Sequence, residues 1–231
     1  MKAIILAAGE GKRMRPLTLV KPKPMVEVLG KPLLHHIIDA LPSEITELII
    51  VIGYKGEQIV AYFGDVFEGR PVTYIRQEKP EGQAHALLLC REFIAPHERF
   101  LFLFADDLHS ARALKALLRH ERAILVREHE HPERFGVVTV SEDGRVRAIE
   151  EKPEHPKSNL VVTGVYLLDS NIFGFPLAEK THGEYYIADQ INKLVKGYDV
   201  VVEKTDFWHP VGYPEDIASA EKVLKGRQKT G

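Results

Sequence analysis

The residues best suited to chemistry stand near the amino terminus, where a glycine loop is followed by a run of cations. Gly9 and Gly11 allow the backbone to turn sharply and to approach a ligand closely. The cations that follow are Lys12, Arg13, Arg15, Lys21 and Lys23. Backbone N–H groups in such a loop bind phosphate oxygens while the cations neutralise charge. This combination predicts a polyphosphate site rather than an ordinary surface turn.

Neither of the two common phosphate-loop motifs is present. GxxxxGK[ST] does not occur, and Gly-x-Gly-x-x-Gly fails because Met14 occupies the third glycine position. The segment reads LAAGEGKRMRPLT, followed by PKPM, and closely resembles the signature of the sugar-1-phosphate nucleotidyltransferases. The R-x-P-L-T continuation distinguishes it from the molybdopterin guanylyltransferase branch. The matching residues are Gly9, Gly11, Arg13, Pro16, Leu17, Thr18, Lys23 and Pro24.

This resemblance implies how the segment would bind a nucleoside triphosphate. The loop at Ala8, Gly9 and Gly11 would bind the nucleotide. Arg13, with the loop, would hold the leaving β- and γ-phosphates, and Lys23 would approach the α-phosphate. The resemblance therefore assigns Arg13 and Lys23 to catalysis.

A second segment, residues 77–86, reads QEKPEGQAHA and resembles the base-reading stretch of the same family. By this match the Gln77 amide and the Gly82 backbone N–H would read the edge of the nucleobase. An amide offers both a donor and an acceptor, so it suits a pyrimidine or a purine edge equally well. A solvated loop position is the alternative for Gln77, and we interpret His85 as a packing or capping residue.

The most apolar run of the chain, RFLFLFA at 99–105, ends in two carboxylates, Asp106 and Asp107. A carboxylate at the carboxyl end of a central strand, facing a glycine loop, is well placed to bind Mg²⁺. The resemblance assigns the metal to Asp106, whereas Asp107 falls at a variable position. Capping of a helix that starts near Ser110 is the alternative for Asp107. Mg²⁺ is therefore the expected cofactor.

A third segment, residues 148–166, contains EEKP and VTGVY and resembles the thymidylyl- and uridylyltransferases. The match implies that Glu151 accepts hydrogen bonds from sugar hydroxyls and that Lys152 pairs with the sugar phosphate. It also implies that the backbone at Gly136 and Gly164 lies against the sugar.

One position departs from the family pattern. Relatives carry W-x-D-[VT]-G near the carboxyl terminus, and that aspartate is the second protein ligand of Mg²⁺. Here the run is WHPVG, with Pro210 at the aspartate position, and proline has no side-chain oxygen. Three interpretations stay open: Asp106 suffices with phosphates and water, Asp107 or Asp206 substitutes, or activity is lost.

The elements that must position these residues form an α/β pattern. Short apolar runs alternate with helical stripes, which predicts a Rossmann-like, mostly parallel mixed sheet flanked by helices. A hairpin pattern follows and predicts an inserted β-rich sugar-binding lobe, as in the nucleotide-diphospho-sugar transferase fold. We expect strands at 3–7, 48–52, 72–75, 99–105, 135–140, 145–149, 160–168 and 200–203, and helices at 32–41, 55–63, 184–195 and from 214.

We expect a single domain over residues 1–231. Residues 1–130 would form the nucleotide-binding part, and residues 131–231 the sugar-binding part with the carboxyl-terminal helix.

The bulk composition favours a small-molecule enzyme. A formal net charge of −2 and a pI of about 6.6 argue against nucleic acid and membrane as partners. The single cysteine, Cys90, excludes an internal disulfide and fits a reducing compartment, which predicts a cytoplasmic protein. Sparse Asn, Gln, Met and Cys with 28% charged residues is typical of thermophilic proteins. A homo-oligomer stays open.

These features predict transfer of a nucleotidyl group from dTTP or UTP to a sugar 1-phosphate, giving an NDP-sugar and pyrophosphate. The sugar phosphate is already an anionic nucleophile, so positioning and charge neutralisation suffice for catalysis. Two alternatives remain: a catalytically impaired regulatory subunit, which Pro210 favours, and a cytidylyltransferase for another phosphorylated small molecule. Neither the base nor the sugar follows from the sequence.

Overall fold

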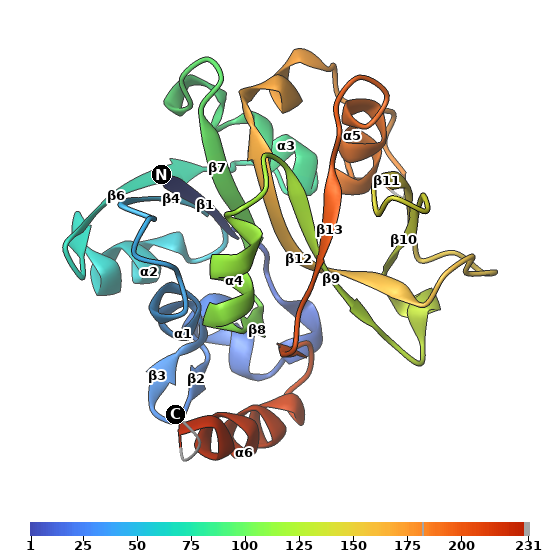
Figure 1. Ribbon diagram of the computed structural model, residues 1–231. Helices are drawn as coiled ribbons and strands as arrows, with labels where there is room; N and C mark the ends of the chain where they lie inside the picture. Colours follow the sequence, from blue (N-terminus) through green and yellow to red (C-terminus); the bar gives the residue numbers. More distant parts are fainter. Residues whose placement is uncertain (182, 229–231) are drawn as a thin grey trace.

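A mixed β-sheet forms the centre of the computed structural model, which describes residues 1–181 and 183–228 (Figure 1). Within these residues its ten strands follow the order β11-β10-β12-β7-β1-β4-β6-β5, with β9 paired to β12 and β13 to β9. The strands are β1 (Lys2–Ala7), β4 (Glu47–Ile52), β5 (Val66–Phe67), β6 (Arg70–Arg76), β7 (Arg99–Phe104), β9 (Ala123–Glu128), β10 (Gly136–Val140), β11 (Val146–Glu151), β12 (Leu160–Asp169) and β13 (Val201–Lys204). The β1, β4, β6 and β7 strands run parallel, whereas β12 is antiparallel to β7. The predicted mostly parallel, mixed sheet is confirmed.

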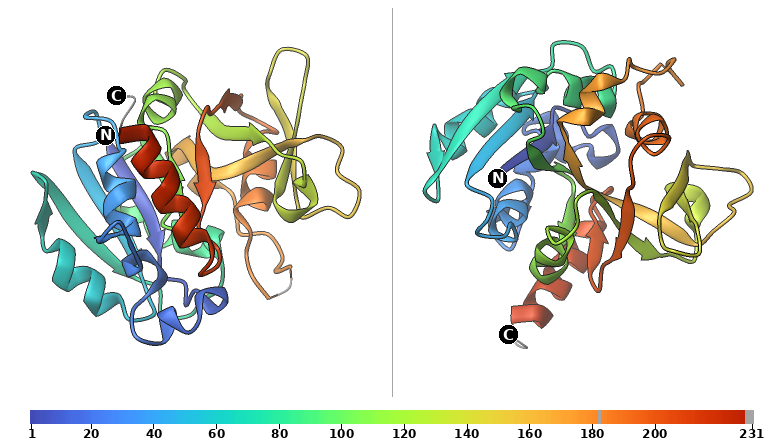
Figure 2. Two further views of the ribbon diagram at one scale, coloured as in Figure 1. Left: turned by 90° about the horizontal axis from the view of Figure 1, so that it is seen from below. Right: turned by 45° about the horizontal axis from the view of Figure 1, so that its top comes forward.

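Helices cover both faces of this sheet (Figures 1 and 2). They are α1 (Leu33–Asp39), α2 (Gly56–Phe63), α3 (Gln83–Leu88), α4 (Ala111–Leu117), α5 (Ile187–Leu194) and α6 (Asp216–Gln228). In β1, Ile4 and Ile5 are both fully buried, Ile4 in the core cluster shared with α3 and α5 and Ile5 in the cluster shared with the other helices. Burial of both faces explains why this strand is apolar without alternation. Among the described residues, no helix is long and apolar enough to cross a membrane.

The parallel strands all end at one edge of the sheet, and this edge positions the candidate site. The backbone N–H of Gln77, just after β6, donates to the carbonyl of Ile52 at 2.8 Å. The N–H of Ala105, just after β7, donates to the carbonyl of Leu6 at 3.1 Å. These hydrogen bonds bring the segments that follow β1, β4, β6 and β7 side by side.

The predicted hairpin is confirmed, since β10 and β11 pair antiparallel and β10 meets β12 at Val137 and Val161. In Figure 2 the hairpin lies at the far end of the molecule from α1 and α2. Strand β9 and two small sheets were not expected from the sequence. Their strands are β8 (Asp107–His109) with β14 (Trp208–Pro210), and β2 (Glu27–Val28) with β3 (Lys31–Pro32).

Two helices begin later than predicted. Helix α5 begins at Ile187 because residues 181 and 184 exchange backbone hydrogen bonds in a turn before it. Helix α6 begins at Asp216, whose Oδ2 accepts from the N–H groups of Gly212 and Tyr213 at 2.8 Å each. The remaining short 3₁₀ helices are η1 (Lys12–Met14), η2 (Leu17–Leu19), η3 (Lys23–Met25), η4 (Arg91–Phe93), η5 (Pro132–Arg134) and η6 (Ser170–Gly174).

Candidate functional site

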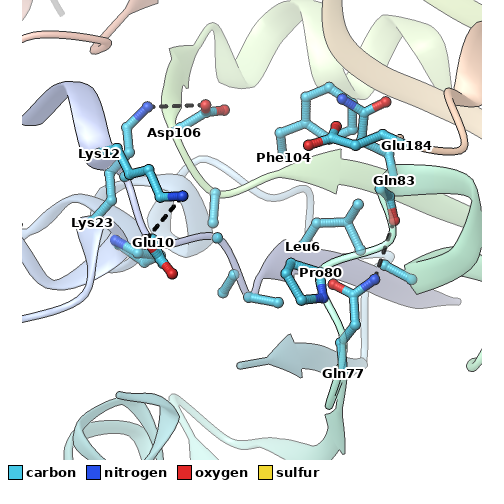
Figure 3. A pocket seen from close by; sticks show the side chains of 18 of the residues that line it. Leu6, Glu10, Lys12, Lys23, Gln77, Pro80, Gln83, Phe104, Asp106 and Glu184 are labelled. Carbon is cyan, nitrogen blue, oxygen red and sulfur yellow. Dashed lines mark hydrogen bonds and ion pairs between the residues drawn. The ribbon is translucent and has the colours of Figure 1, made fainter. Parts of the chain in front are cut away.

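A cavity of about 650 Å³ opens at the edge where the parallel strands end (Figure 3). The glycine loop forms one side of it, and the segment after β6 forms another. The cavity brings together most of the residues that the sequence singled out: Ala8, Gly9, Gly11, Arg13, Lys23, Gln77, Gly82 and Asp106.

The glycine loop is held in a conformation that only glycine fits at position 11. Gly11 has a φ of 62°, and a Cβ there would lie 2.7 Å from the Cβ of Lys23. The hydroxyl of buried Thr18 donates to the Gly11 carbonyl at 3.0 Å. Met14, which replaces a third glycine, is fully buried in the core. The loop is therefore anchored by packing and by hydrogen bonding.

Three of the five expected cations, Lys12, Arg13 and Lys23, line the cavity, whereas Arg15 and Lys21 do not. The exposed Arg13 guanidinium lies 5.3 Å from the centre of the Tyr213 ring, a cation–π distance.

Lys23 and Asp106 form the central ion pair of the cavity. The Lys23 ammonium lies 3.0 Å from Asp106 Oδ2, as Figure 3 shows. The lysine side chain is 10% exposed and the aspartate 37% exposed, so the carboxylate stays accessible from the cavity. Asp106 also accepts a backbone hydrogen bond from Val211 at 3.1 Å. One carboxylate beside a phosphate loop is a donor set that fits Mg²⁺, which takes one or two carboxylates together with substrate phosphates.

The other two aspartates considered as metal ligands face elsewhere. Asp107 Oδ2 accepts from the Trp208 indole N–H at 2.8 Å, and burial, with Asp106 nearby, raises the pKa of Asp107 to about 8. Asp206 lies 3.4 Å from Arg112 in an ion pair. Neither aspartate lines the cavity, and Pro210 pairs with Asp107 across β8 and β14. The structure therefore gives no support to substitution by Asp107 or Asp206.

The segment after β6 packs against the loop before α5. Gly82 has a φ of 100°, and a Cβ there would lie 2.6 Å from the carbonyl oxygen of Tyr185. The Gln77 amide nitrogen donates to the Gly82 carbonyl at 3.2 Å and lies 3.1 Å from His85 Nδ1. His85, interpreted from the sequence as a packing or capping residue, contacts the Gln77 side chain through its ring. A sequence pattern does not reveal this contact, since the turn at residues 78–82 creates it.

The four residues expected at the sugar do not line this cavity. Gly136 pairs with Glu151 across the hairpin, and burial raises the pKa of the Glu151 carboxyl. Lys152, with a φ of 46°, extends its ammonium to 3.7 Å from Glu151. A Cβ at Gly164 would lie 2.8 Å from the Phe104 ring, which forms part of the cavity wall.

Sequence reasoning assigned no role to Phe104 or Tyr213, yet Phe104 lines the cavity wall (Figure 3) and Tyr213 contacts Arg13. Glu184, which the sequence match placed at the border of the sugar, also lines this cavity. Phe104 had a signal, because it is the penultimate residue of the apolar run before Asp106. The sequence carries no comparable signal for Tyr213, since its approach to Arg13 depends on the pairing of β14 with β8.

Comparison with known proteins decides the family. The family model for nucleotidyl transferases matches residues 2–226. The chain belongs to this nucleotidyl transferase family. Members of the family generally use a divalent metal ion, and Asp106 is the one aspartate among the described residues that line this cavity.

Several relatives of this nucleotidyl transferase are similar over most of its length. A UTP–glucose-1-phosphate uridylyltransferase of Haloferax volcanii is 39% identical, with 97% of each chain covered. The bifunctional protein GlmU of Methanocaldococcus jannaschii is 36% identical, but this chain spans 56% of its length. A Bacillus anthracis protein assigned as a glucose-1-phosphate thymidylyltransferase has a solved structure with a TM-score of 0.86 and 31% identity, covering 96% of this chain and 94% of its own.

Proposed function

We propose that this nucleotidyl transferase transfers a nucleotidyl group from UTP or dTTP to a sugar 1-phosphate, releasing pyrophosphate. The Lys23–Asp106 ion pair inside a glycine-loop cavity carries this proposal, because it combines a phosphate-binding cation with a metal-binding carboxylate. The relatives named for uridylyl and thymidylyl transfer to glucose 1-phosphate support it.

In this reaction an oxygen of the sugar phosphate attacks the α-phosphorus of the NTP in line. The new O–P bond forms as the bond between the α-phosphorus and its bridging oxygen breaks, and that oxygen leaves with pyrophosphate. Arg13 and the N–H groups of the glycine loop neutralise the charge of the leaving group. Lys23 leaves its contact with Asp106 to reach the α-phosphate. Positioning and charge neutralisation lower the barrier without a general base.

Mg²⁺ fits the donor set as the metal ion. When bound, it supplies charge that stabilises the phosphate oxygens during transfer. Asp106 would hold it from the protein, and its one protein carboxylate is within the range that Mg²⁺ uses when phosphates and water complete the coordination.

The orientation of the Gln77 amide supports UTP or dTTP as the donor. The Gly82 carbonyl can only accept a hydrogen bond, so the amide nitrogen 3.2 Å away must be the atom that faces it. The amide oxygen is then the atom left to accept from a base. Uracil and thymine present a ring N–H to such an acceptor, whereas the same ring nitrogen of cytosine only accepts. This reasoning weighs against CTP.

For the sugar phosphate, we keep the assignment that the sequence resemblance implied. Glu151 and Lys152 lie together at the end of β11, where one can accept from hydroxyls and the other can pair with phosphate. Neither Gly136 nor Gly164 has space for a side chain, since a Cβ would lie 2.9 Å from Val162 and 2.8 Å from the Phe104 ring, respectively.

The composition of the chain also bears on the compartment and the partners that we propose. Net charge of −2 and one buried cysteine fit the cytoplasm, with freely diffusing NTP and sugar 1-phosphate as partners. Assembly into a homo-oligomer stays a prediction.

Pyrophosphate release tests this function. The protein is incubated with Mg²⁺, each of UTP, dTTP, CTP, GTP and ATP, and a panel of hexose 1-phosphates. We expect pyrophosphate only when both substrates are present, and the fastest release with UTP or dTTP. Release from NTP without a sugar phosphate, or fastest release with CTP, would contradict the proposal.

Pro210 favours a second candidate function, a non-catalytic nucleotide-binding subunit, because the second metal aspartate of the family is missing. That candidate predicts UTP or dTTP binding by calorimetry with no pyrophosphate release at any Mg²⁺ concentration. Turnover with any sugar 1-phosphate rules it out.

A further inference from the structure

His85 has two polar neighbours, which together determine which of its ring nitrogens carries the proton. Its Nδ1 lies 3.1 Å from the amide nitrogen of Gln77, in the cavity wall. Its Nε2 lies 3.5 Å from Glu81, which is itself 2.6 Å from the Lys180 ammonium. The ring side chain is 21% exposed, so solvent competes only partly for these contacts.

The Gly82 carbonyl settles which atoms donate. Because that carbonyl accepts from the Gln77 amide nitrogen, the second amide N–H is directed to His85 Nδ1. Nδ1 must then be the accepting ring nitrogen, and the imidazole proton is on Nε2, facing Glu81. In the part of the chain that the structure describes, both amide hydrogens of Gln77 are engaged and the amide oxygen accepts no hydrogen bond.

We propose that His85 is a positioning residue that fixes the Gln77 amide with its oxygen toward the base, and so sets the preference for uracil or thymine over cytosine. The inference rests on the proposed base contact of Gln77. Glu81 stabilises this arrangement on the other side of the ring, because its carboxylate favours the tautomer of His85 with the proton on Nε2.

The physical reason lies in the symmetry of a carboxamide. Its two ends have nearly the same shape, so hydrogen-bond partners alone decide which end faces a ligand. Without His85, the 3.2 Å hydrogen bond to the Gly82 carbonyl is the one hydrogen bond of the amide that remains among the described residues to oppose its rotation. A rotated amide donates to the ring nitrogen of cytosine and leaves uracil with opposing donors. Loss of His85 should therefore change base selectivity more than catalytic rate.

The test compares kcat/KM for UTP and dTTP with kcat/KM for CTP, at saturating glucose 1-phosphate. In His85→Leu we expect the UTP-to-CTP ratio to fall by about three- to tenfold, as for loss of one hydrogen bond. His85→Asn, whose side-chain oxygen can accept in place of Nδ1, should stay within about twofold of wild type. His120→Leu is the matched control, because His120 also pairs with a glutamate, Glu203 at 2.8 Å, but this partner does not line the cavity, whereas Gln77 does.

Each outcome bears on the proposal. An unchanged ratio in His85→Leu, or an equal fall in His85→Asn, overturns it. Gln77→Ala separates the two levels of inference. If Gln77→Ala also leaves the ratio unchanged, the base contact of Gln77 is itself wrong. If Gln77→Ala lowers the ratio and His85→Leu does not, only the role of His85 fails. Should His85→Leu unfold, His85→Ala provides the same comparison, since alanine is well tolerated in a helix.

Discussion

At the scale of single residues, adjacent aspartates have opposite environments. The Asp106 side chain faces the cavity and Lys23, whereas the half-buried Asp107 side chain accepts a hydrogen bond from the Trp208 indole. Burial, with the Asp106 charge nearby, raises the pKa of Asp107 and so favours its protonated form relative to an ordinary aspartate. One carboxylate is therefore suited to bind a cation, and its neighbour serves the packing of β8 on β14.

We expect Asp106→Asn to lower Mg²⁺-dependent turnover by roughly a hundredfold or more, because it removes the anionic ligand but keeps the shape of the side chain. Asp107→Asn is the matched control. It resembles the protonated acid, can still accept from Trp208, and should turn over nearly as fast as wild type. Initial rates with thermal unfolding curves check both variants. Near-normal rates in Asp106→Asn would contradict the metal assignment.

Pro210 stands beside this site in β14, directly across from Asp107. We expect Pro210→Asp to lower the Mg²⁺ concentration for half-maximal rate, because a second carboxylate reduces the dependence on water and phosphate ligands. Titrating Mg²⁺ against initial rate, for wild type and variant, measures the shift. An unchanged midpoint would mean that the new carboxylate does not reach the ion.

Lys152→Ala should raise KM for the sugar 1-phosphate by roughly ten- to hundredfold, as expected for loss of a charge-assisted hydrogen bond to phosphate. KM for the NTP should change far less. Lys157→Ala, a nearby lysine outside the EEKP motif, serves as the control. Steady-state kinetics with each substrate varied gives both constants. An equal rise in the two KM values would place Lys152 in the nucleotide site or in the fold.

At the scale of secondary-structure elements, α3 and α5 depend on each other at the cavity. The Ala84 N–H donates to the Tyr185 carbonyl at 3.0 Å, and the Tyr185 N–H donates to the Glu81 carbonyl at 2.8 Å. These contacts leave no space for a side chain at Gly82. The segment after β6 and the loop before α5 therefore form one wall of the cavity.

Gly82→Ala should destabilise this wall. Gly69→Ala is the matched control, because both glycines have a left-handed φ but a Cβ at Gly69 meets nothing within 4 Å. Both variants should then carry backbone strain from a positive φ, and the clash with Tyr185 is specific to Gly82. We expect Gly82→Ala to lower the free energy of unfolding by about 1–3 kcal/mol more than Gly69→Ala. Urea unfolding measures the difference, and equal losses would exclude the clash.

At the scale of the whole molecule, one continuous sheet carries both groups of expected site residues. The expected nucleotide residues stand at the ends of parallel strands, and the expected sugar residues stand on the hairpin or on β12, which joins the hairpin to β7. The Phe104 ring lies between these groups, supported by Gly164.

The folded state also carries a buried histidine that links stability to pH. Both ring nitrogens of His109 lack a partner among the described residues, and burial lowers its pKa from 6.5 to about 4. Between these values the unfolded chain binds the proton and the folded protein does not. The free energy of unfolding therefore loses nothing through His109 above pH 6.5. As the pH falls from 6.5 toward 4, it decreases by about 3 kcal/mol, because the unfolded chain is stabilised by the proton that it binds. Urea unfolding should show that the free energy of unfolding of His109→Leu falls less steeply with decreasing pH than that of wild type. The same pH dependence in both proteins would contradict the lowered pKa of His109.

The sequence by itself determined the features that depend on contiguous residues. The strand, glycine loop and cations near the amino terminus form one uninterrupted pattern, so the phosphate loop and the family resemblance followed from it. The alternation of apolar runs and helical stripes indicated the mostly parallel sheet for the same reason, because parallel strands buried on both faces need continuous apolar runs.

Only the tertiary structure decided the contacts between distant segments. It turned Asp107 toward Trp208, brought Tyr213 to Arg13, and placed His85 against the Gln77 amide. None of these contacts has a local signal, because each depends on strand pairing or on a turn that sets the direction of a side chain. The same residue types in the same order could face solvent; packing of the whole sheet directs them to their partners.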